Sequence, residues 1–189
     1  MRIISGKFRS RKIYSNFNGS NCHKADFSGY RPTTDRARET LFNVLNNLID
    51  FDEAVCLDLF AGSGAVGFEL ISRGAGSCDF VENSGKQLEC IKKTAAFLNC
   101  EENVNIYNEN AAAFLKRHHD KYYDIIFADP PYNYEHYNEL LMNIRELKFG
   151  IFILEHSGES AGMILMNDYE IIHKKTGTTN FTILNSKEN

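Results

Sequence analysis

The stretch VCLDLFAGSG, residues 55–64, decides the fold that this sequence predicts. Its apolar first half is typical of a buried strand, and Gly62 and Gly64 let the backbone turn sharply and let a ligand touch the main chain. A helical pattern begins at about residue 64. The first amides of that helix would point at whatever lies beyond the strand. We therefore expect a strand–turn–helix unit with a ligand site at the carboxyl end of the strand.

Strand-like and helix-like patterns alternate along the rest of the chain. Strands are expected at 55–60, 77–82, 103–108, 123–128, 150–155, 169–174 and 180–184, and helices at about 64–73, 85–99, 110–118 and 136–147. This alternation predicts a parallel sheet covered by helices on both faces. The last two strands are joined only by residues 175–178, which is typical of a hairpin and places an antiparallel strand in the sheet.

The sequence Asp129-Pro130-Pro131-Tyr132 follows the apolar run 122–128. Proline has no N–H for a sheet ladder and forces extended or turn geometry on the residue before it. The carbonyls of Asp129 and Pro130 should therefore be fixed at the carboxyl end of that strand. A carboxylate, fixed carbonyls and an aromatic face suit a flat molecule that carries an NH2 group. The alternative is a stiff turn without a ligand.

Two further positions follow predicted strands. Glu82 ends the second strand, where a carboxylate can accept both hydroxyls of a ribose. Asn110 and Ala111 follow the third strand, where an adenine edge could be recognised.

A dinucleotide site is a competing hypothesis. Gly62, Gly64 and Gly67 form G-x-G-x-x-G, and Glu82 lies 20 residues after Gly62, which matches the fingerprint of a nicotinamide oxidoreductase. Asp58 weighs against this hypothesis, because a carboxylate at the strand end repels a pyrophosphate and attracts an ammonium group. The sequence after residue 150 also offers no second mononucleotide-binding half. A glycine turn with no ligand is the third possibility.

Composition and charge narrow the class of protein. The 189 residues suit one α/β domain with a small extension, and no apolar run approaches the roughly 20 residues of a membrane span. The five cysteines are scattered, so we expect neither a metal site nor disulfides, and we expect a cytoplasmic protein. The net charge of −4 is uneven: residues 1–40 hold nine Lys/Arg and three Asp/Glu, while residues 41–189 hold twelve and twenty-two.

The basic segment forms an N-terminal extension. We expect a short hairpin within residues 2–14, a mobile loop at 15–30, and the main domain over 31–189, which opens with a helix capped by Thr34. Arg36 and Arg38 are expected to lie off the apolar stripe of that helix. A basic arm on an acidic body can bind a polyanion at one face. A solvated basic hairpin is the alternative.

These motifs together resemble a known family. Residues 58–64, Glu82, residues 110–111 and residues 129–132 resemble the S-adenosylmethionine and (Asn/Asp)-Pro-Pro-(Tyr/Phe) motifs of amino-group methyltransferases. RIISGKFRSRK at 2–12 and RPTTDRARETLFN at 31–43 narrow the likeness. Over residues 2 to about 185 the chain resembles the RsmD family of bacterial 16S rRNA guanine-N2 methyltransferases.

The resemblance implies a Rossmann-like methyltransferase fold, a seven-stranded mostly parallel sheet with one antiparallel strand. It also implies methyl transfer from S-adenosylmethionine to the N2 amine of one guanine of 16S rRNA, guanine-966 in the family. The substrate is then expected within the small ribosomal subunit or an assembly intermediate, and the enzyme is expected to be a monomer.

The implied site residues fall into three groups. The cofactor would be held by Asp58, Phe60, Ala61, Gly62, Ser63, Gly64, Glu82, Asn83, Asn110 and Ala111. The catalytic group would be Asp129, Pro130, Pro131 and Tyr132. RNA phosphates would meet Arg2, Lys7, Arg9, Arg11, Lys12, Arg31, Arg36 and Arg38, although Arg38 could instead pair with Asp35 or Glu39. Methyltransferases acting on DNA adenine or protein glutamine, and a noncatalytic RNA-binding protein, remain alternatives.

Overall fold

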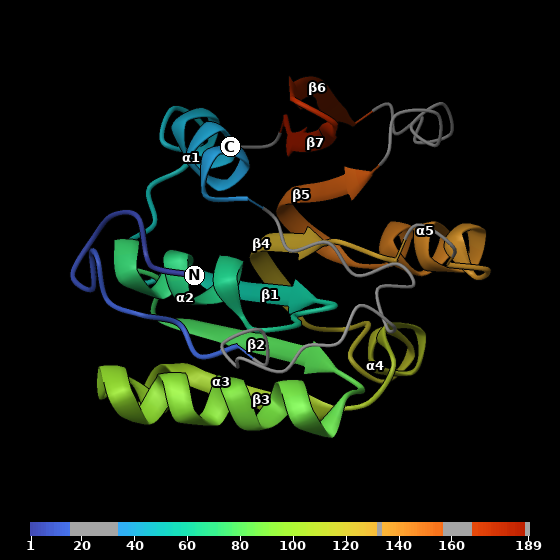
Figure 1. Cartoon of the computed structure of the whole chain (residues 1–189). Coiled ribbons are helices and arrows are strands. Elements are labelled where there is room, and N and C mark those ends of the chain that lie inside the picture. The colour runs from blue at the N-terminus through green and yellow to red at the C-terminus, as the bar shows by residue number, and fades with distance from the viewer. Residues whose placement is uncertain (16–33, 132–133, 157–167, 188–189) are drawn as a thin grey trace.

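A single seven-stranded sheet forms the centre of the computed structural model, which describes residues 1–15, 34–131, 134–156 and 168–187 (Figure 1). The strand order is β3-β2-β1-β4-β5-β7-β6. The strands are β1 (Val55–Leu59), β2 (Ser77–Glu82), β3 (Val104–Asn108), β4 (Tyr122–Ala128), β5 (Lys148–His156), β6 (Tyr169–Thr176) and β7 (Thr179–Ser186). Strands β1 to β5 pair in parallel, and β7 is antiparallel to both β5 and β6. The predicted sheet with one antiparallel strand is confirmed.

Helices cover both faces of this sheet. They are α1 (Asp35–Leu45), α2 (Ala65–Arg73), α3 (Gly85–Leu98), α4 (Ala111–Arg117) and α5 (Tyr137–Arg145), with a short 3₁₀ turn at Glu101–Asn103. The apolar residues of α1, α2 and α3 join one core cluster, and those of α4 and α5 join a second cluster on the other face. The central strands are apolar almost throughout because both of their faces are buried.

Local backbone chemistry sets where the helices begin. We predicted starts at residues 64 and 110, but α2 begins at Ala65 and α4 at Ala111. Gly64 has a φ of 76°, in the left-handed region, so it cannot belong to the helix. Asn110 is extended and is the N-cap, and its side chain accepts a hydrogen bond from the Ala113 N–H at 2.8 Å.

The N-terminal arm, residues 1–14, packs against the same core. Arg2 and Lys12 form an isolated antiparallel bridge, and the N–H groups of Ile3 and Ile13 donate to the carbonyls of Arg11 and Met1 at 3.0 and 3.1 Å, so the segment turns back on itself as expected but forms no regular strands. Ile3 and Ile13 are fully buried in the cluster beneath α1, α2 and α3. The expected mobile loop at 15–30 lies outside the described residues apart from Ser15.

Candidate active site

Strand β1 is the point in the sheet where the order of strands changes direction: β2 and β3 were added on one side of it, and β4 and β5 on the other. Strand β2 lies on one side of β1 and β4 on the other, and all three run in parallel. Their carboxyl ends therefore meet at one edge of the sheet, the edge where open α/β sheets bind ligands. Figure 1 shows the ends of β1, β2 and β4 on this side of the sheet. The glycine loop follows β1, Glu82 ends β2 and Asp129 follows β4, so the topology brings them together. We call this edge the active edge.

The glycine loop turns through three left-handed residues. The φ angles are 74° at Phe60, 54° at Gly62 and 76° at Gly64. Such a φ is costly for a bulky residue, and strained residues of this kind cluster at ligand sites. The N–H groups of Phe60 and Ala61 donate to the Val81 carbonyl at 3.1 and 3.0 Å, which ties the loop to the end of β2. The loop is therefore held in a fixed shape.

Asp58 is a buried carboxyl group at the base of this loop. Its Oδ2 accepts a hydrogen bond from the Gly67 N–H at 3.0 Å. Burial raises the pKa of Asp58 to about 7, the Gly67 hydrogen bond opposes the shift, and the charge of Glu82 adds to it. The stability that this group contributes is complete below the ordinary Asp pKa of about 3.9 and is lost as the pH rises through about 7. A cation bound here would favour the ionised carboxylate.

Glu82 braces the loop from the neighbouring strand. Its Oε2 accepts from the Gly62 N–H and its Oε1 accepts from the Ser84 N–H, both at 2.8 Å. A carboxylate has about four acceptor positions, so two hydrogen bonds leave capacity for a diol. The residue is half-buried. Its geometry fits the ribose role that the sequence predicted.

The predicted adenine-side residues lie along the same edge. Asn83 and Asn110 are exposed, and Ala111 is buried in the first turn of α4. The side-chain oxygen of Asn110 is engaged in capping α4, so this residue has a structural role beside any contact with a ligand.

Asp129 leaves the end of β4 next to two other carboxyl groups. Ala128 pairs with Leu154 in the sheet, so Asp129 and Glu155 each come one residue beyond that pair. Burial raises the pKa of Asp129 well above its ordinary value, and the charges of Glu155 and Asp58 raise it further. The charge of Asp58 affects the pKa of Asp129 because β1 and β4 are neighbouring strands. An Asp129 carboxylate at this position is an unusually basic one.

The proline corner and the glycine loop lie on the same side of the molecule. The Tyr134 ring meets the Phe60 ring edge-on, with 5.2 Å between the centroids. The Tyr134 N–H also donates to the Pro131 carbonyl at 2.9 Å. Pro130 is buried and Pro131 is exposed. Tyr132 lies outside the described residues, so its predicted stacking role stays a prediction.

The predicted RNA-contacting cations divide into two sets. The exposed set is Arg2, Lys7, Arg9, Arg11, Lys12 and Arg36. Arg31 lies outside the described residues. Arg38 differs from all of them, because it is fully buried.

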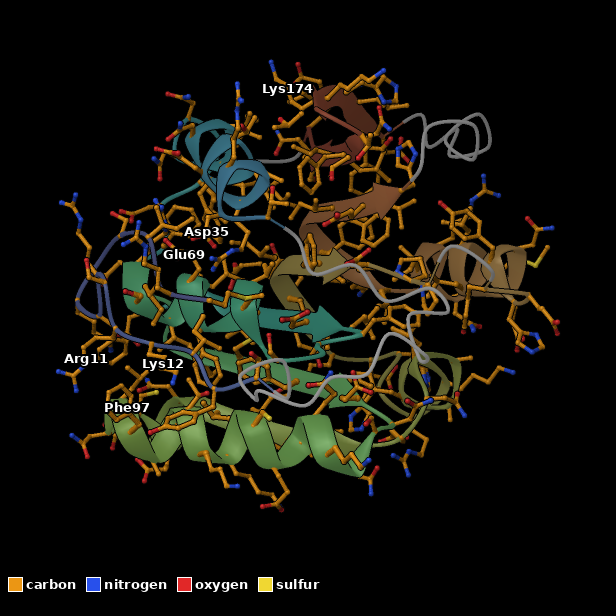
Figure 2. All side chains as sticks on the ribbon, viewed as in Figure 1. Arg11, Lys12, Asp35, Glu69, Phe97 and Lys174 are labelled. Carbon is orange, nitrogen blue, oxygen red and sulfur yellow. The ribbon has the colours of Figure 1, made fainter. Side chains whose placement is uncertain are left out.

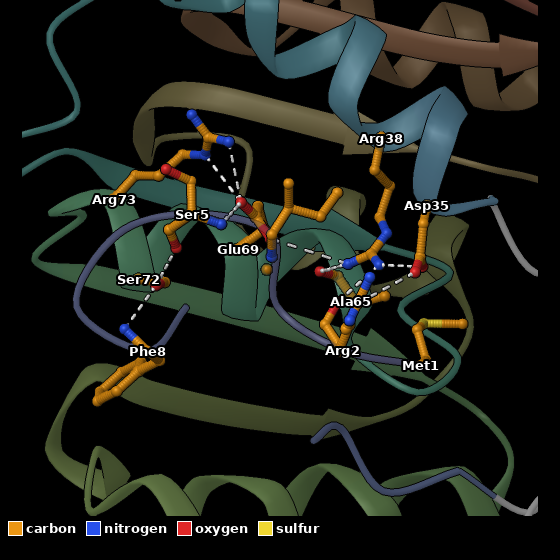
Figure 3. A network of polar contacts seen from close by, with 12 residues as sticks. Met1, Arg2, Ser5, Phe8, Asp35, Arg38, Ala65, Glu69, Ser72 and Arg73 are labelled. Atoms are coloured by element: carbon orange, nitrogen blue, oxygen red, sulfur yellow. Dashed lines mark hydrogen bonds and ion pairs between the residues drawn. The ribbon is translucent and has the colours of Figure 1, made fainter. Parts of the chain in front are cut away.

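The prediction that Arg38 contacts RNA is wrong. One of its terminal nitrogens, Nη2, donates to the Arg2 carbonyl at 2.8 Å and to Asp35 Oδ1 at 2.7 Å (Figure 3). The other, Nη1, donates to the Ala65 carbonyl at 3.3 Å and lies 3.9 Å from the Glu69 carboxylate. Arg38 lies on the buried face of α1, because its partners come from the arm and from α2. The alternative, an ion pair with Asp35, is confirmed.

Sequence reasoning missed three features of the site. Glu155 is buried beside Asp129, and its place at the end of the predicted strand 150–155 could have revealed it. Glu69 is the acceptor that holds the N-terminal arm, and it is the only acidic residue of α2. The Ser63 hydroxyl lies 3.7 Å from the Met1 sulfur, so the side chain of Met1 contacts the glycine loop. The sequence carries no marker of that contact.

The fold is the one found in S-adenosylmethionine-dependent methyltransferases. A solved methyltransferase of this class from Agrobacterium tumefaciens shares the fold, with a TM-score of 0.62 at 19% identity over 84% of this chain and 64% of that one. Relatives that are at least 33% identical and named as methyltransferases set the nicotinamide hypothesis aside and support S-adenosylmethionine as the cofactor. The donor set fits it: a buried carboxyl for the ammonium group, a left-handed glycine loop, and Glu82 with spare acceptor capacity.

The chain belongs to the family described as Conserved hypothetical protein 95, whose model matches residues 1–185, and this is the RsmD family. Among its relatives is the ribosomal RNA small subunit methyltransferase D of Haemophilus influenzae, 33% identical over 93% of this chain and 88% of that protein. The protein of the same name from Buchnera aphidicola is 36% identical over 92% and 86%. The solved Escherichia coli protein yhhF superposes with a TM-score of 0.81 at 29% identity, covering 100% of this chain and 99% of that one.

Proposed function

We propose that this protein transfers a methyl group from S-adenosylmethionine to the N2 amine of one guanine in 16S rRNA, guanine-966 in the family. The observation that carries the proposal is the shared edge: the carboxyl of Asp129 follows β4 beside the glycine loop that follows β1, and the Tyr134–Phe60 contact joins the two. The names of the relatives support rRNA as the substrate. The motifs of DNA adenine and protein glutamine methyltransferases usually begin with Asn, so Asp129 favours guanine.

When bound, the cofactor supplies a methyl group on a positively charged sulfur. In this proposal Asp58 and the loop from Phe60 to Gly64 hold its methionine end. Glu82 accepts the ribose hydroxyls with Asn83 beside it, and residues 110–111 contact the adenine. These contacts fix the position of the methyl group, and orientation of this kind can account for much of a rate enhancement.

The guanine N2 amine is a poor nucleophile because its lone pair is delocalised into the ring. Hydrogen bonds from the NH2 group to the Asp129 carboxylate and the Pro130 carbonyl favour a tetrahedral nitrogen whose lone pair faces the methyl group. The raised pKa of Asp129 makes its ionised form a competent acceptor for the proton that leaves. Tyr132 stacks on the base, a contact worth roughly 1–3 kcal/mol.

The arm supplies contacts to the rest of the substrate. In this proposal Arg2, Lys7, Arg9, Arg11, Lys12, Arg31 and Arg36 meet phosphates of the RNA. Phosphate contacts of this kind position an RNA but do not select the base that is methylated. We propose that the substrate is the small ribosomal subunit or an assembly intermediate, and that the enzyme acts as a cytoplasmic monomer. Across the described residues, no helix has the length and apolar character that crossing a membrane requires.

Cofactor affinity should depend on pH through Asp58. The affinity should rise as the pH approaches about 7, because only the ionised carboxylate attracts the ligand's ammonium group. Asp58→Asn keeps an oxygen for the Gly67 N–H but should bind about 10- to 100-fold more weakly at pH 8, as expected for a charged hydrogen bond. Calorimetry from pH 6 to 8 measures both proteins. The α-amino group of S-adenosylmethionine titrates near 7.7–8.0 with either protein, so it contributes equally to both pH profiles. Identical profiles for the wild type and Asp58→Asn would therefore show that Asp58 does not bind the ammonium group.

A labelling experiment tests the function. The protein is incubated with radiolabelled S-adenosylmethionine and small ribosomal subunits that lack the modification, and the product is mapped by nuclease digestion. We expect label in 16S rRNA alone, at N2 of a single guanine. Label in another RNA, in protein or at an adenine would overturn the proposal.

A further inference from the structure

Arginine 11 and Phe97 join the N-terminal arm to the far end of α3. The guanidinium carbon of Arg11 lies over the Phe97 ring, 4.7 Å from its centroid, and Nη2 donates to the Phe97 carbonyl at 3.4 Å. The Tyr14 ring meets the same ring edge-on at 5.7 Å. Lys12 lies 5.6 Å from the centroid of the Tyr14 ring. Figure 2 shows Arg11, Lys12 and Phe97 gathered at this end of the helix.

Exposed cations adjoin the aromatic pair, Arg11 and Lys12 from the arm and Lys93 from α3. Lys93 is exposed and lies four residues before Phe97 on α3, and Lys86 lies seven residues earlier still. Residues at these spacings share one face of a helix. The acidic residue of α3, Glu89, lies on the same face four residues before Lys93 and is 3.7 Å from Lys92. Glu101 and Glu102 follow the helix, so the cations outnumber the carboxylates on this surface only together with those of the arm. Residues 1–15 contain no acidic side chain. We name Arg11, Lys12, Tyr14, Lys93 and Phe97 the arm–α3 patch.

The patch is fixed in place before any partner arrives. The Tyr14 N–H donates to the Thr94 hydroxyl at 3.0 Å, and that hydroxyl donates to the Cys90 carbonyl at 2.8 Å. Phe97 nevertheless keeps 39% of its surface exposed, in contrast to the buried apolar residues of α3. A side chain already held by its neighbours loses less freedom on binding. An exposed phenylalanine ring can stack on a nucleic acid base, and the cations around it can bind the phosphates.

The patch also lies away from the active edge. Helix α3 follows β2, so its first residues are at the active edge and Phe97 is near its other end. A helix of 14 residues is roughly 20 Å long, at 1.5 Å per residue. A nucleic acid that reaches both places must extend several nucleotides beyond the base that is methylated.

We infer that the arm–α3 patch binds an unpaired segment of the substrate RNA distant from the target guanine, with one base stacked on Phe97 and Arg11 and phosphates on Lys12 and Lys93. The inference rests on the proposed function and extends it with a second RNA contact. An acidic protein surface could pair with the cations, but it would not explain the exposed aromatic ring, which a stacked base would cover. The simplest rival is that Arg11 only covers an apolar ring.

Two variants and two matched controls test the patch. Phe97→Ala removes the stacking surface, and Lys93→Gln removes one exposed charge. Lys174→Gln is the control for charge, since Lys174 lies on β6 at the opposite end of the view in Figure 2. Met142→Ala is the control for an exposed apolar side chain, on α5 and 66% exposed. Filter binding to 16S rRNA over a range of salt concentrations gives affinities without requiring turnover.

Phe97→Ala should weaken RNA binding about 5-fold or more, as expected for loss of a stacked base. Lys93→Gln should lower the slope of log affinity against log salt by about 0.7, the value for one phosphate contact on a single strand. Both should raise KM for the small subunit and leave kcat and cofactor affinity unchanged. The controls should match the wild type.

The outcomes separate the inference from the function on which it rests. If Phe97→Ala changes the melting temperature but not RNA affinity, the ring has a packing role only and the inference fails. Weakened binding that appears equally in the controls would also overturn it. If the wild type binds RNA through the patch but labels no guanine, the proposed function fails while the RNA contact stands.

Discussion

Asp129→Ala should reduce methyl transfer by about 10²-fold or more while cofactor affinity stays within about tenfold. The loss is of this size because the side chain is proposed both to orient the amine and to accept its proton, and general base catalysis alone contributes about 10²- to 10⁴-fold. The cofactor contacts are assigned to other residues, at the ends of β1, β2 and β3. Single-turnover assays on small subunits give the rate, and calorimetry gives the affinity.

The ionised carboxyl group of Asp129 should also destabilise the fold. Burial and the charges of Glu155 and Asp58 raise the pKa of Asp129, so folding favours its protonated form. The stability contributed by that form is complete below the ordinary pKa of about 3.9 and is lost as the pH rises toward the raised value. Asp129→Asn should therefore melt at a higher temperature than the wild type, by a margin that grows between pH 5 and pH 8. Catalytic residues often lower the stability of the fold while they serve the activity, as proposed here for Asp129.

Asp120→Asn is the matched control for both measurements. Its side chain is 93% exposed, so neither the rate nor the pH dependence of melting should change. Asp129→Asn also separates two roles of the carboxylate, because an amide oxygen still accepts a hydrogen bond but cannot take a proton. A variant that retained the wild-type rate would remove Asp129 from the mechanism. A margin in melting temperature that shrank with rising pH would contradict the electrostatic account.

The parts of this fold that were predictable are those set by neighbours in the sequence. Thr34 was recognised as an N-cap, and its hydroxyl does accept from the Ala37 N–H at 3.2 Å. The glycine loop and the proline corner follow from backbone chemistry at Gly64 and Pro130. The order of strands and helices follows from apolar periodicity, which a buried parallel sheet imposes strongly.

The parts that failed depend on contacts between distant residues. Arg38 was placed on an exposed face because arginine is rarely buried without partners. Its partner Asp35 is a neighbour in the helix, but Arg2, Ala65 and Glu69 come from other segments, and no local pattern could reveal them. Strand ends shifted for the same reason: β5 runs from Lys148 to His156, beyond the predicted 150–155, because it pairs with β4 on one side and β7 on the other.

Glu69→Gln should cost about 3–5 kcal/mol of unfolding free energy, the range for breaking a buried ion pair. Glu69 is fully buried, and its Oε2 accepts from the Ile4 N–H at 2.7 Å while Oε1 accepts from the Ser5 N–H and Arg73 Nε at 3.0 Å (Figure 3). Glutamine keeps one acceptor oxygen but points an NH2 group at donors. It also leaves the buried Arg38 with less opposing charge.

The loss should loosen the arm before it unfolds the domain. The arm's backbone is fixed by Glu69 and by Ser72, whose hydroxyl accepts from the Phe8 N–H at 2.9 Å and lies 2.5 Å from the Ser5 carbonyl. At a temperature where Glu69→Gln is still folded, we therefore expect weaker RNA binding with unchanged cofactor affinity. Urea unfolding measures the free energy, and amide exchange at Ile4 and Ser5 reports the arm. The control is Glu139→Gln, whose ion pair with Lys116 is at the surface and should leave the unfolding midpoint unchanged. Equal midpoints for Glu69→Gln and the control would show that the buried carboxylate does not hold the arm.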